Sequence, residues 1–456
     1  MGQAMIERKP MQPHRVFLLI APLLYVAYAL LTPPFQTPDE HQHLFRAWQL
    51  SEFHMLGERR GDEAGGSLPD GLGRAAAIEI GAVDPHAPRP IIKRPFNALF
   101  SRHTPIDTGA PPQFFNFLGS VIYSPAGYLP QVGAIWLGKA GGLSVEDIDR
   151  LGRLFNAAVA MLLIYCAMRV TPVGALGLMW VGLLPMTGAA SAAFGQDGLA
   201  IGGACLLTAI GLRVVLNGGW RRSELLIAAA VTVLLALSKV LYLPLGAVGG
   251  QPFARGEIQR RRLVVAMLIC LVAAVPASVW LHAVSPIVVP PRPYVPPAAE
   301  RLGVWLHHPV ELLRLLEQTY VAHGIHLFET LFTFGWLTVG PVRSAEVLSL
   351  AGLVLVFLAG DATAGQIIWQ TRAWLLLIAA SIALLISVAT YLYWARSSET
   401  WIQGLQGRYF IPIAPLIVVA FLRKHDSDAP YIAFTAALMI AANCLVLGTI
   451  VSSYYQ

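Results

Sequence analysis

Residues 373–393 read AWLLLIAASIALLISVATYLY, a run of 21 residues without a charged side chain. An α-helix needs about 20 mainly apolar residues to cross the roughly 30 Å hydrocarbon core of a bilayer, so this run predicts a membrane-spanning helix. Comparable apolar runs begin near Val16, Leu154, Val173, Leu199, Glu224, Leu263, Glu346, Ala373, Tyr409 and Tyr431. The chain is therefore expected to be an all-α polytopic membrane protein.

The composition of the whole chain agrees with this expectation. Of its 456 residues, 56% are hydrophobic and 13% are charged, against about 25% charged in soluble globular proteins. This balance argues against a cytosolic enzyme, a disordered chain and a disulfide scaffold. The basic excess, 32 Lys and Arg against 26 Asp and Glu, lies mostly in short clusters between apolar runs. It gives no sign of a nucleic-acid partner.

The positions of the basic residues predict the topology, because short basic loops mark the cytoplasmic side. Arg8, Lys9 and Arg15 place the N-terminus inside. Two segments are ambiguous: residues 117–138, and residues 224–250, which form either one long span or two short ones. The later basic clusters fall inside if residues 117–138 do not cross and residues 224–250 form a two-pass hairpin. We therefore expect about eleven crossings.

This topology divides the chain into five parts. They are the N-terminus and first transmembrane helix (residues 1–32), a long outer loop (33–150), a transmembrane bundle (151–284), a second long outer loop (285–343) and the C-terminal transmembrane helices (344–456). Both loops are polar and rich in proline, and structureless loops of such length are usually functional. The candidate chemistry is therefore sought in and beside them.

The first loop opens with PPFQTPDEHQHLFR, residues 33–46. Thr37 and Glu40 have the spacing of a capping box, which would give Glu40 a structural role. Asp39 would then be the second helical residue, and Asp39, Glu40 and His43 would share one side of the helix. Such a group suits a general base just above the hydrocarbon boundary. The alternative for this stretch is a divalent-metal site, whose ligands would be Asp39, His41 and His43.

A second candidate acid is Asp197, in the sequence SAAFGQDG of residues 191–198. It would be a plain N-cap if it only satisfied the start of the apolar helix that follows. The residues before it are small and apolar, however, which places its charge at or below the membrane interface. Acids in or near the membrane are candidates for function by default.

Three cations lie at comparable places. Lys239 interrupts an apolar run at the outer turn of the expected hairpin, and Arg408 and Tyr409 follow the glycines of QGLQGRYF, where a guanidinium and backbone N–H groups can approach an anion. Arg153 opens the helix after the first loop. Two of them have a plainer interpretation, Lys239 as a snorkelling lysine and Arg153 as a topological anchor. Two outer acids with outer cations favour a lipid phosphate donor whose headgroup meets an acceptor at the interface.

Motifs along most of the chain resemble a known family. They are PPFQTPDEHQHLFRAWQLSE, IYSPAGYLPQ, RLGRLFN, LPMTGAASAAFGQDG, LSKVLYLPL, FGWLTVGP and QGLQGRYFIPIAPL, in this order. The chain resembles a bacterial polytopic membrane family labelled as a domain of unknown function and grouped with the GT-C glycosyltransferases, which use polyprenyl-phosphate sugars. Many relatives have Pro-Asp-Glu-Pro before the histidine. Here His41 replaces the second proline, which adds a possible ligand.

The resemblance implies a GT-C-like bundle of about 11 transmembrane helices, with juxtamembrane helices in the first periplasmic loop. It also implies a bacterial inner-membrane location and an active site facing the periplasm. An acid of the first outer loop is commonly catalytic or metal-associated in GT-C enzymes, which matches Asp39. An acid of the second outer loop contributes to the site, which matches Asp197.

The expected function is therefore inverting transfer of a sugar from a polyprenyl-phosphate donor to a polysaccharide, lipid or protein acceptor. Asp39 would be the base, with Glu40 in reserve, and Asp197 would orient the acceptor or the base. The donor phosphate and substrate would be bound by Lys239, Arg408, Arg153, His43 and Tyr409, and a divalent cation (Mg²⁺ or Mn²⁺) is a possible cofactor. The alternatives are a lipid-linked sugar flippase and a non-catalytic partner in polysaccharide assembly.

Overall fold

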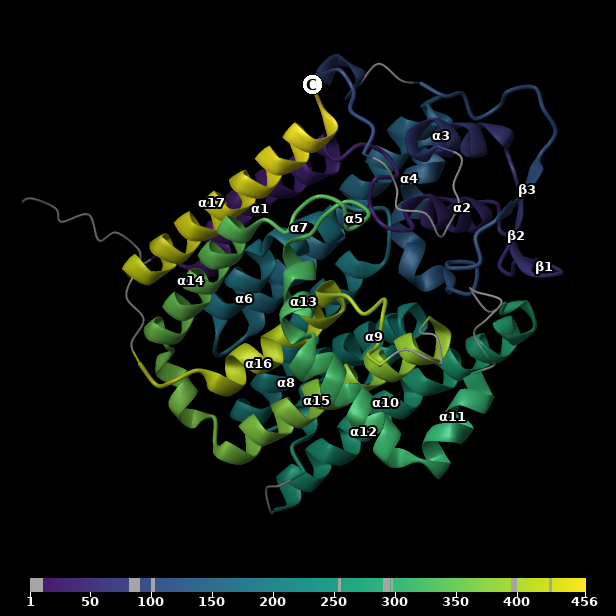
Figure 1. The fold of residues 1–456 in the computed structure, drawn as a ribbon. Helices are drawn as coiled ribbons and strands as arrows, with labels where there is room; N and C mark the ends of the chain where they lie inside the picture. The colour runs from purple at the N-terminus through teal and green to yellow at the C-terminus, as the bar shows by residue number, and fades with distance from the viewer. Residues whose placement is uncertain are drawn as a thin grey trace, which may run out of the picture.

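A computed structural model describes residues 11–81, 91–99, 103–252, 256–289, 296, 298–394, 400–425 and 429–456. Arg8 and Lys9, which the topology argument used, lie outside them. Six helices of the described residues are long and apolar enough to cross a membrane. They are α1 (Pro13–Leu31), α5 (Val145–Val170), α8 (Asp197–Asn217), α10 (Glu257–Val284), α15 (Trp369–Tyr393) and α17 (Ala429–Tyr454). The chain has the helices of a multi-pass membrane protein (Figure 1).

The remaining apolar runs form shorter or interrupted helices. They are α6 (Ala175–Leu183), α7 (Pro185–Ser191), α9 (Arg222–Ser238), the 3₁₀ helix η3 (Val240–Gly250), α14 (Arg343–Ala359), the 3₁₀ helix η7 (Ala362–Gln366), and η8 (Gly407–Ile413), which leads into α16 (Ala414–Phe421). The run at residues 224–250 is divided at Lys239, as the two-segment alternative predicts. None of these segments is among the six candidate spans, so the expected count of eleven crossings stays a prediction.

Small and polar residues bring the helices of the bundle together. A Cβ on Gly202 of α8 would lie 2.8 Å from the Leu163 side chain of α5, so only glycine allows this close approach. Buried Asn443 of α17 accepts a hydrogen bond from the Tyr28 hydroxyl at 2.9 Å and donates to the Leu183 carbonyl at 2.8 Å. It thereby ties α17 to α1 and to the end of α6, and α1 and α17 run side by side in Figure 1.

Residues 33–144, here named the first loop domain, pack around a second apolar core, to which Val145, Ile148, Phe194, Ile287 and Val289 also contribute. Their elements are α2 (Glu40–Ser51), β1 (Glu58–Arg60), β2 (Glu63–Leu68), α3 (Asp70–Ile80), the 3₁₀ helix η1 (Phe96–Leu99), β3 (Gln113–Asn116), the 3₁₀ helix η2 (Pro125–Tyr128) and α4 (Leu129–Ala140). The strands form an antiparallel sheet in the order β1-β2-β3. The expectation of an all-α chain missed this sheet.

Two boundaries of the first loop domain bear on the topology. Within residues 117–138 the described helices are η2 and part of α4, which has 12 residues and is too short to cross a bilayer. That segment is not a candidate span, which agrees with its omission from the crossings. The helix α5 begins at Val145, earlier than the boundary expected at residue 150.

Residues 285–342, the second loop region, contain short helices. They are η4 (Ser285–Ile287), α11 (Ala298–His307), α12 (Pro309–Glu317), the π-helix η5 (Gln318–Ala322), α13 (Gly324–Glu329) and the 3₁₀ helix η6 (Thr330–Phe332). Trp305 of α11 stacks on Tyr391 of α15 with the ring centroids 4.3 Å apart. The region is thus anchored to the bundle.

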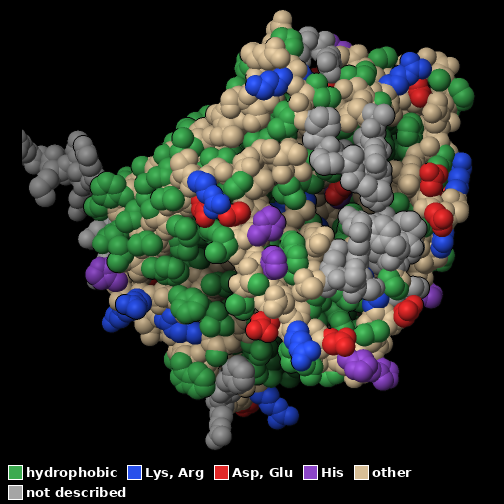
Figure 2. Space-filling view, in the orientation of Figure 1, with side chains coloured by type: hydrophobic (Ala, Val, Ile, Leu, Met, Phe, Trp, Pro, Cys, Tyr) green, Lys and Arg blue, Asp and Glu red, His purple; other side chains and the backbone are tan. Residues whose placement is uncertain are grey.

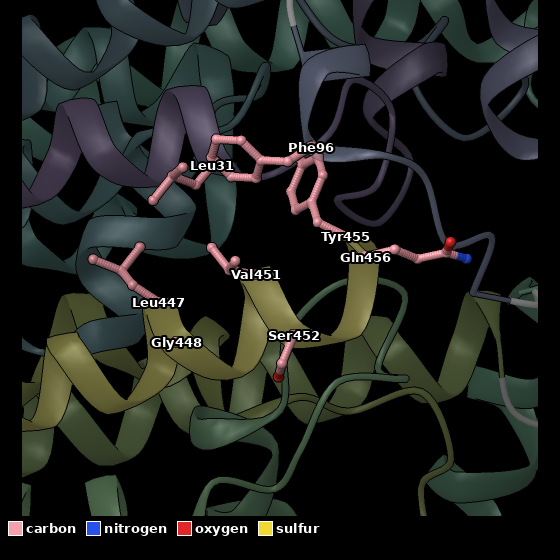
Figure 3. A pocket seen from close by; sticks show the side chains of 8 residues that line it. All are labelled: Leu31, Phe96, Leu447, Gly448, Val451, Ser452, Tyr455 and Gln456. Atoms are coloured by element: carbon pink, nitrogen blue, oxygen red, sulfur yellow. The ribbon is translucent and has the colours of Figure 1, made fainter.

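The surface separates apolar from charged areas. Figure 2 shows hydrophobic side chains gathered over α14 and α17, whereas charged side chains line the opposite edge and the lower part of this face. Where α1 and α17 end, an open apolar groove of about 510 Å³ is lined by Leu31, Phe96, Leu447, Gly448, Val451, Ser452, Tyr455 and Gln456 (Figure 3). None of the candidate site residues lines this groove.

Candidate functional site

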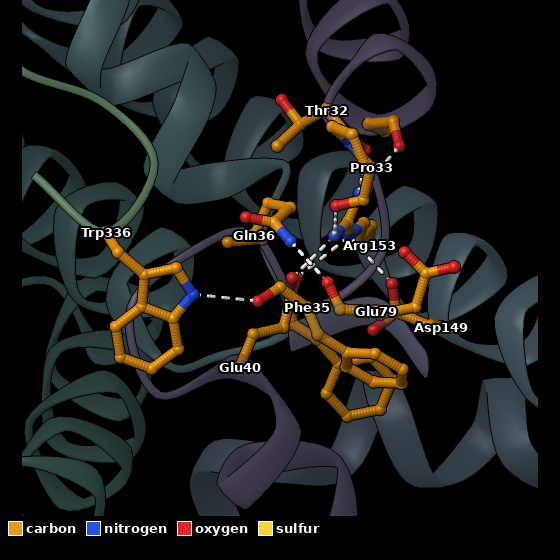
Figure 4. A network of polar contacts seen from close by, with 12 residues as sticks. Thr32, Pro33, Phe35, Gln36, Glu40, Glu79, Asp149, Arg153 and Trp336 are labelled. Atoms are coloured by element: carbon orange, nitrogen blue, oxygen red, sulfur yellow. Dashed lines mark hydrogen bonds and ion pairs between the residues drawn. The ribbon is translucent and has the colours of Figure 1, made fainter. Parts of the chain in front are cut away.

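A buried ion-pair network connects the first loop domain to the bundle (Figure 4). Arg153 of α5 and Glu40 of α2 are both fully buried, and the guanidinium donates to the two Glu40 carboxylate oxygens at 2.8 and 2.5 Å. Arg153 also forms an ion pair with buried Asp149 at 3.0 Å. It donates further hydrogen bonds to the carbonyls of Ala29, Thr32 and Pro33. The end of α1 is thereby fixed against α5 and α2.

Glu40 holds a second backbone segment as well. Its Oε1 accepts a hydrogen bond at 2.8 Å from the backbone N–H of Phe194, three residues before Asp197. Asn156 of α5 donates to the neighbouring Ala193 carbonyl at 3.0 Å. Glu40 therefore positions both segments that carry a candidate acid, the one ending at Asp39 and the one ending at Asp197.

These contacts correct the expectations for Asp39, Glu40 and Arg153. The helix α2 begins at Glu40, and Asp39 is its N-cap residue in the left-handed conformation. Glu40 consequently does not form the capping box with Thr37, because its carboxylate is bound to Arg153 and Phe194. A fully buried, ion-paired Glu40 is poorly placed to be a reserve base, and Arg153 is equally poorly placed to bind a phosphate. Both side chains instead bind backbone groups of neighbouring segments.

Asp39 adjoins Glu40 in the chain but is not fully buried. Its φ of 62° is unusual for a residue other than glycine. The side chain is half-buried and accepts a hydrogen bond from Gln42 Nε2 at 3.4 Å. Asp39 also interacts electrostatically with Arg408 and with Tyr123. The left-handed turn thus directs adjacent acids into different surroundings.

A second group of charges, here named the half-buried cluster, consists of Asp39, His43, Asp197, Lys239 and Arg408. Lys239 Nζ forms an ion pair and hydrogen bond with Asp197 Oδ1. Arg408 Nε lies 3.9 Å from Asp197 Oδ2. The side chains of Asp197, Lys239 and Arg408 are 23%, 17% and 15% exposed, so a ligand can reach them.

Local backbone breaks bring these charges together. Asp197 is the first residue of α8, Lys239 lies between α9 and η3, and Arg408 lies at the start of η8. The ring of Tyr409 lies 5.8 Å from Lys239 Nζ and 5.4 Å from Arg408 Cζ, within range of a cation–π interaction. The Tyr242 hydroxyl donates to the Tyr409 carbonyl at 2.9 Å. The two cations therefore share one acid and one aromatic ring.

Arg408 has unused hydrogen-bonding capacity. Its buried Nε atom has no hydrogen-bond partner among the residues that the structure describes, and its 3.9 Å separation from Asp197 is too long for a hydrogen bond. Buried donors without partners are rare in folded proteins and call for an explanation. An anionic ligand beside Arg408 would supply the missing acceptor.

His43 is the neutral member of the cluster. Its Nδ1 lies 2.6 Å from the Tyr128 hydroxyl, and its ring stacks on Tyr123 at 5.9 Å. Burial, and then the charges of Lys239 and Arg408, lower the pKa of His43 to about 3 although Asp197 opposes the shift. The imidazole is thus uncharged at neutral pH. It is a hydrogen-bonding group here and not a third cation.

Residues 122–131, IYSPAGYLPQ, brace this cluster from the side of the first loop domain. Buried Gln131 donates from Nε2 to the Gly195 carbonyl at 2.5 Å, two residues before Asp197. Buried Arg46 donates to the Tyr123 carbonyl from Nε at 3.1 Å. From the sequence this stretch bore only on the topology and the family resemblance, and no role was expected of Tyr123, Tyr128 or Gln131. Its Tyr and Gln residues next to helix-breaking prolines were the signal that could have suggested one.

The proposed metal site is not formed. Among the described residues, no three His, Cys, Asp or Glu side chains lie close enough together to hold a metal ion. His41 points to a different environment from His43, since its ring lies 5.9 Å from those of Phe45 and Trp336. The structure therefore separates His41 from the half-buried cluster.

Comparisons with known proteins agree with the membrane character of the fold. No curated protein and no solved structure matches the chain. The profile of one protein family, described as predicted membrane protein (DUF2142), matches residues 23–417. This range includes both acids, both cations and the buried ion-pair network, and the chain belongs to this family.

Proposed function

We propose that the protein is an inverting glycosyltransferase of GT-C type, which transfers a sugar from a polyprenyl-phosphate donor at the outer face of a bacterial inner membrane. The acceptor would be a glycan, a lipid or a protein in the periplasm. One observation carries the proposal: Lys239 and Arg408 converge on Asp197 in a solvent-accessible cluster, and Arg408 also interacts with a second acid, Asp39.

The charges around Asp197 suit the proposed donor, although Asp39 makes the half-buried cluster as a whole neutral. Lys239, Arg408 and Asp197 together leave one net positive charge beside Asp39, since His43 is neutral. A sugar linked to a polyprenol through a phosphodiester carries one negative charge. The phosphomonoester released by transfer gains further negative charge. Cations in a half-buried site stabilise this developing charge more strongly than they would in water.

The reaction follows from these roles. The acceptor hydroxyl loses its proton to the Asp39 carboxylate, and its oxygen forms a bond to the anomeric carbon. The bond between that carbon and the phosphate oxygen breaks, and its electron pair leaves on polyprenyl phosphate, which Lys239 and Arg408 hold. Attack opposite the leaving group inverts the anomeric configuration. Asp197 keeps the two cations aligned on the phosphate.

Neutral groups complete the site. Tyr409 supplies an aromatic face beside both cations, and His43 and Tyr128 supply hydrogen-bonding groups for sugar hydroxyls. Asp197 is already paired with Lys239 and Arg408, and the described residues offer no group of three ligands for a divalent cation. No step of the reaction is therefore assigned to Mg²⁺ or Mn²⁺.

The test is transfer by the purified protein in proteoliposomes that contain polyprenyl-phosphate carrying a radiolabelled hexose. Release of polyprenyl phosphate and labelling of an added membrane glycan fraction are both measured. Asp39→Asn is expected to lower transfer on the order of 10²–10⁴-fold, the usual contribution of a general base. Asp62→Asn, at an exposed acid of the same domain, is the matched control and should transfer normally.

Three outcomes would contradict the proposal. Full activity in Asp39→Asn would remove Asp39 as the base. Movement of the labelled lipid across the bilayer without any release of polyprenyl phosphate would instead favour a flippase. A non-catalytic partner would show neither activity, and Asp39 and Asp197 would then tolerate alanine in a cellular complementation assay.

A further inference from the structure

Trp336 of the second loop region contacts the segment that ends at Asp39. Its indole Nε1 donates a hydrogen bond to the Phe35 carbonyl at 3.0 Å, although the two residues are 301 positions apart (Figure 4). The indole ring also lies 5.9 Å from the ring of His41. The contact therefore spans the Asp39 segment, with one end before the acid and the other after it.

The segment that Trp336 contacts is strained at two positions. Phe35 has a φ of 60° and Asp39 a φ of 62°, in the left-handed region that side chains with a Cβ disfavour. Backbone of this kind persists only when surrounding contacts hold it. Glu40 and Arg153 hold the segment on the bundle side, and Trp336 holds it from the second loop region.

Trp336 is itself on a rigid base. Phe334 and Val339 pair in an isolated antiparallel bridge around it, and Phe334 stacks on Tyr28 of α1 with centroids 6.5 Å apart. A Cβ on Gly335, whose φ is 60°, would lie only 2.2 Å from the Tyr454 hydroxyl of α17. This turn is therefore seated against α1 and α17, so its indole has a fixed place from which to hold Phe35.

We infer that Trp336 is a positioning residue, whose hydrogen bond to Phe35 holds the left-handed turns that set the position of the Asp39 carboxylate. The role of Asp39 as a base rests on the proposed function, whereas the positioning itself is a statement about the Asp39 segment alone. Trp336 is partly exposed, so a competing role exists: its ring could instead form a wall that binds the acceptor.

The first experiment measures the segment without any assay of transfer. In a full-length protein whose four native cysteines are replaced by alanine, Asp39→Cys is labelled with a maleimide in proteoliposomes. Trp336→Phe keeps an aromatic ring but removes the N–H donor, so the labelling rate should change several-fold, on the order expected for one lost hydrogen bond. Trp369→Phe, at a tryptophan that is 70% exposed, is the control and should leave the rate unchanged.

The second experiment separates positioning from binding. Trp336→Phe should lower kcat and leave the KM of donor and acceptor near their wild-type values, because a misplaced base slows the chemical step. An unchanged labelling rate would overturn the inference. So would an increase in acceptor KM at constant kcat, which would make Trp336 a binding wall. If labelling changes while wild type transfers no sugar, the positioning stands and the proposed function fails.

Discussion

Adjacent acids, Asp39 and Glu40, enter two different clusters of charge. Glu40 joins Arg153 and Asp149 in the buried network, where all three side chains are fully buried. Asp39 belongs to the half-buried cluster, whose Asp197, Lys239 and Arg408 side chains keep 15–23% of their surface exposed. Each cluster links the first loop domain to the bundle, so what distinguishes them is access.

The difference in exposure separates a cluster that stabilises the fold from one that can still bind a ligand. The Arg153 guanidinium is surrounded by carboxylate and carbonyl oxygens, which leaves no room for a ligand. Arg408 has a donor without a hydrogen-bond partner in the described part of the chain. The first arrangement stabilises the fold of the site, and the second has capacity left for an anion. The two clusters should therefore respond differently to substitution.

The largest effect is expected from Arg153→Leu. It leaves the carboxylates of Glu40 and Asp149 buried without their cation, and removing one partner of a buried ion pair typically costs about 3–5 kcal/mol. The free energy of unfolding should fall by this order, and the midpoint of thermal unfolding in detergent should fall with it. Transfer would be lost only because the folded protein is lost.

The matched control for that variant is Arg261→Leu. Arg261 pairs with Glu257 on the surface of α10, where both side chains are more than 70% exposed, and such helical pairs contribute about 0.3–0.5 kcal/mol. If Arg153→Leu lowered the unfolding midpoint no more than Arg261→Leu does, the buried network would not stabilise the fold as proposed.

Lys239→Met should have the opposite profile. The substitution removes one cation from the proposed phosphate site, and loss of one electrostatic contact to developing charge commonly lowers kcat by about 10²–10³-fold. Unfolding should change far less than in Arg153→Leu, because Asp197 keeps Arg408 nearby and is partly exposed. Thermal unfolding and transfer rate are measured on the same preparation. If Lys239→Met lowered the unfolding midpoint as much as Arg153→Leu does, the two clusters would not differ in their contribution to stability, and the comparison would be wrong.

A smaller effect is expected on the pH dependence of stability, through the titration of His43. The pKa of His43 is lowered to about 3 by burial, Lys239 and Arg408, with Asp197 opposing, against about 6.5 in an unfolded chain. As the pH falls below 6.5, the unfolded state binds a proton that the folded state does not. Stability is therefore lost progressively from about pH 6.5 toward pH 3.

His43→Gln removes this titration. Between pH 7 and pH 5 the unfolding midpoint of the variant should fall less than that of the wild type. The free energy of unfolding should differ in its pH dependence by the slope that corresponds to about one bound proton. His54→Gln, at an exposed histidine of the same domain, should follow the wild type. Equal slopes in wild type and His43→Gln would show that the half-buried cluster is more open to water than the structure indicates.

Sequence analysis anticipated the members of the half-buried cluster because charges are rare in this chain. Asp39, Asp197, Lys239 and Arg408 each interrupt or border an apolar run, and a charge at such a place is costly unless it is used. Each of these charges is recognised by itself, whatever its distance along the chain from the others. Residues from four separate elements could therefore be identified. The number of crossings is harder to derive, since interrupted segments such as η3 have no clear apolar length.

The roles of Glu40 and Arg153 could not be derived in the same way. A capping box is a local pattern, and the pairing that replaces it joins residues 113 positions apart. The sheet was missed for a similar reason. Its strand β2 is the glycine-containing segment EAGGSL, without the alternation of apolar and polar residues that marks a strand. A Cβ on Gly65 would lie 1.8 Å from the Phe115 carbonyl oxygen, a requirement visible only once β2 and β3 are paired.

The smallest predicted effect concerns the brace between the first loop domain and Asp197. Gln131→Leu removes the donor to the Gly195 carbonyl and leaves that carbonyl unpaired in a buried site, at a cost of about 1–3 kcal/mol. Because the carbonyl lies two residues before Asp197, part of this cost should appear as a shift of the acid relative to Lys239. We expect a several-fold loss of transfer together with a modest loss of stability, measured as above. A loss of stability alone would mean that Gln131 only stabilises the fold, as Glu40 and Arg153 do. A loss of transfer alone would mean that it acts only with the half-buried cluster. Both together are expected of a residue that connects the two.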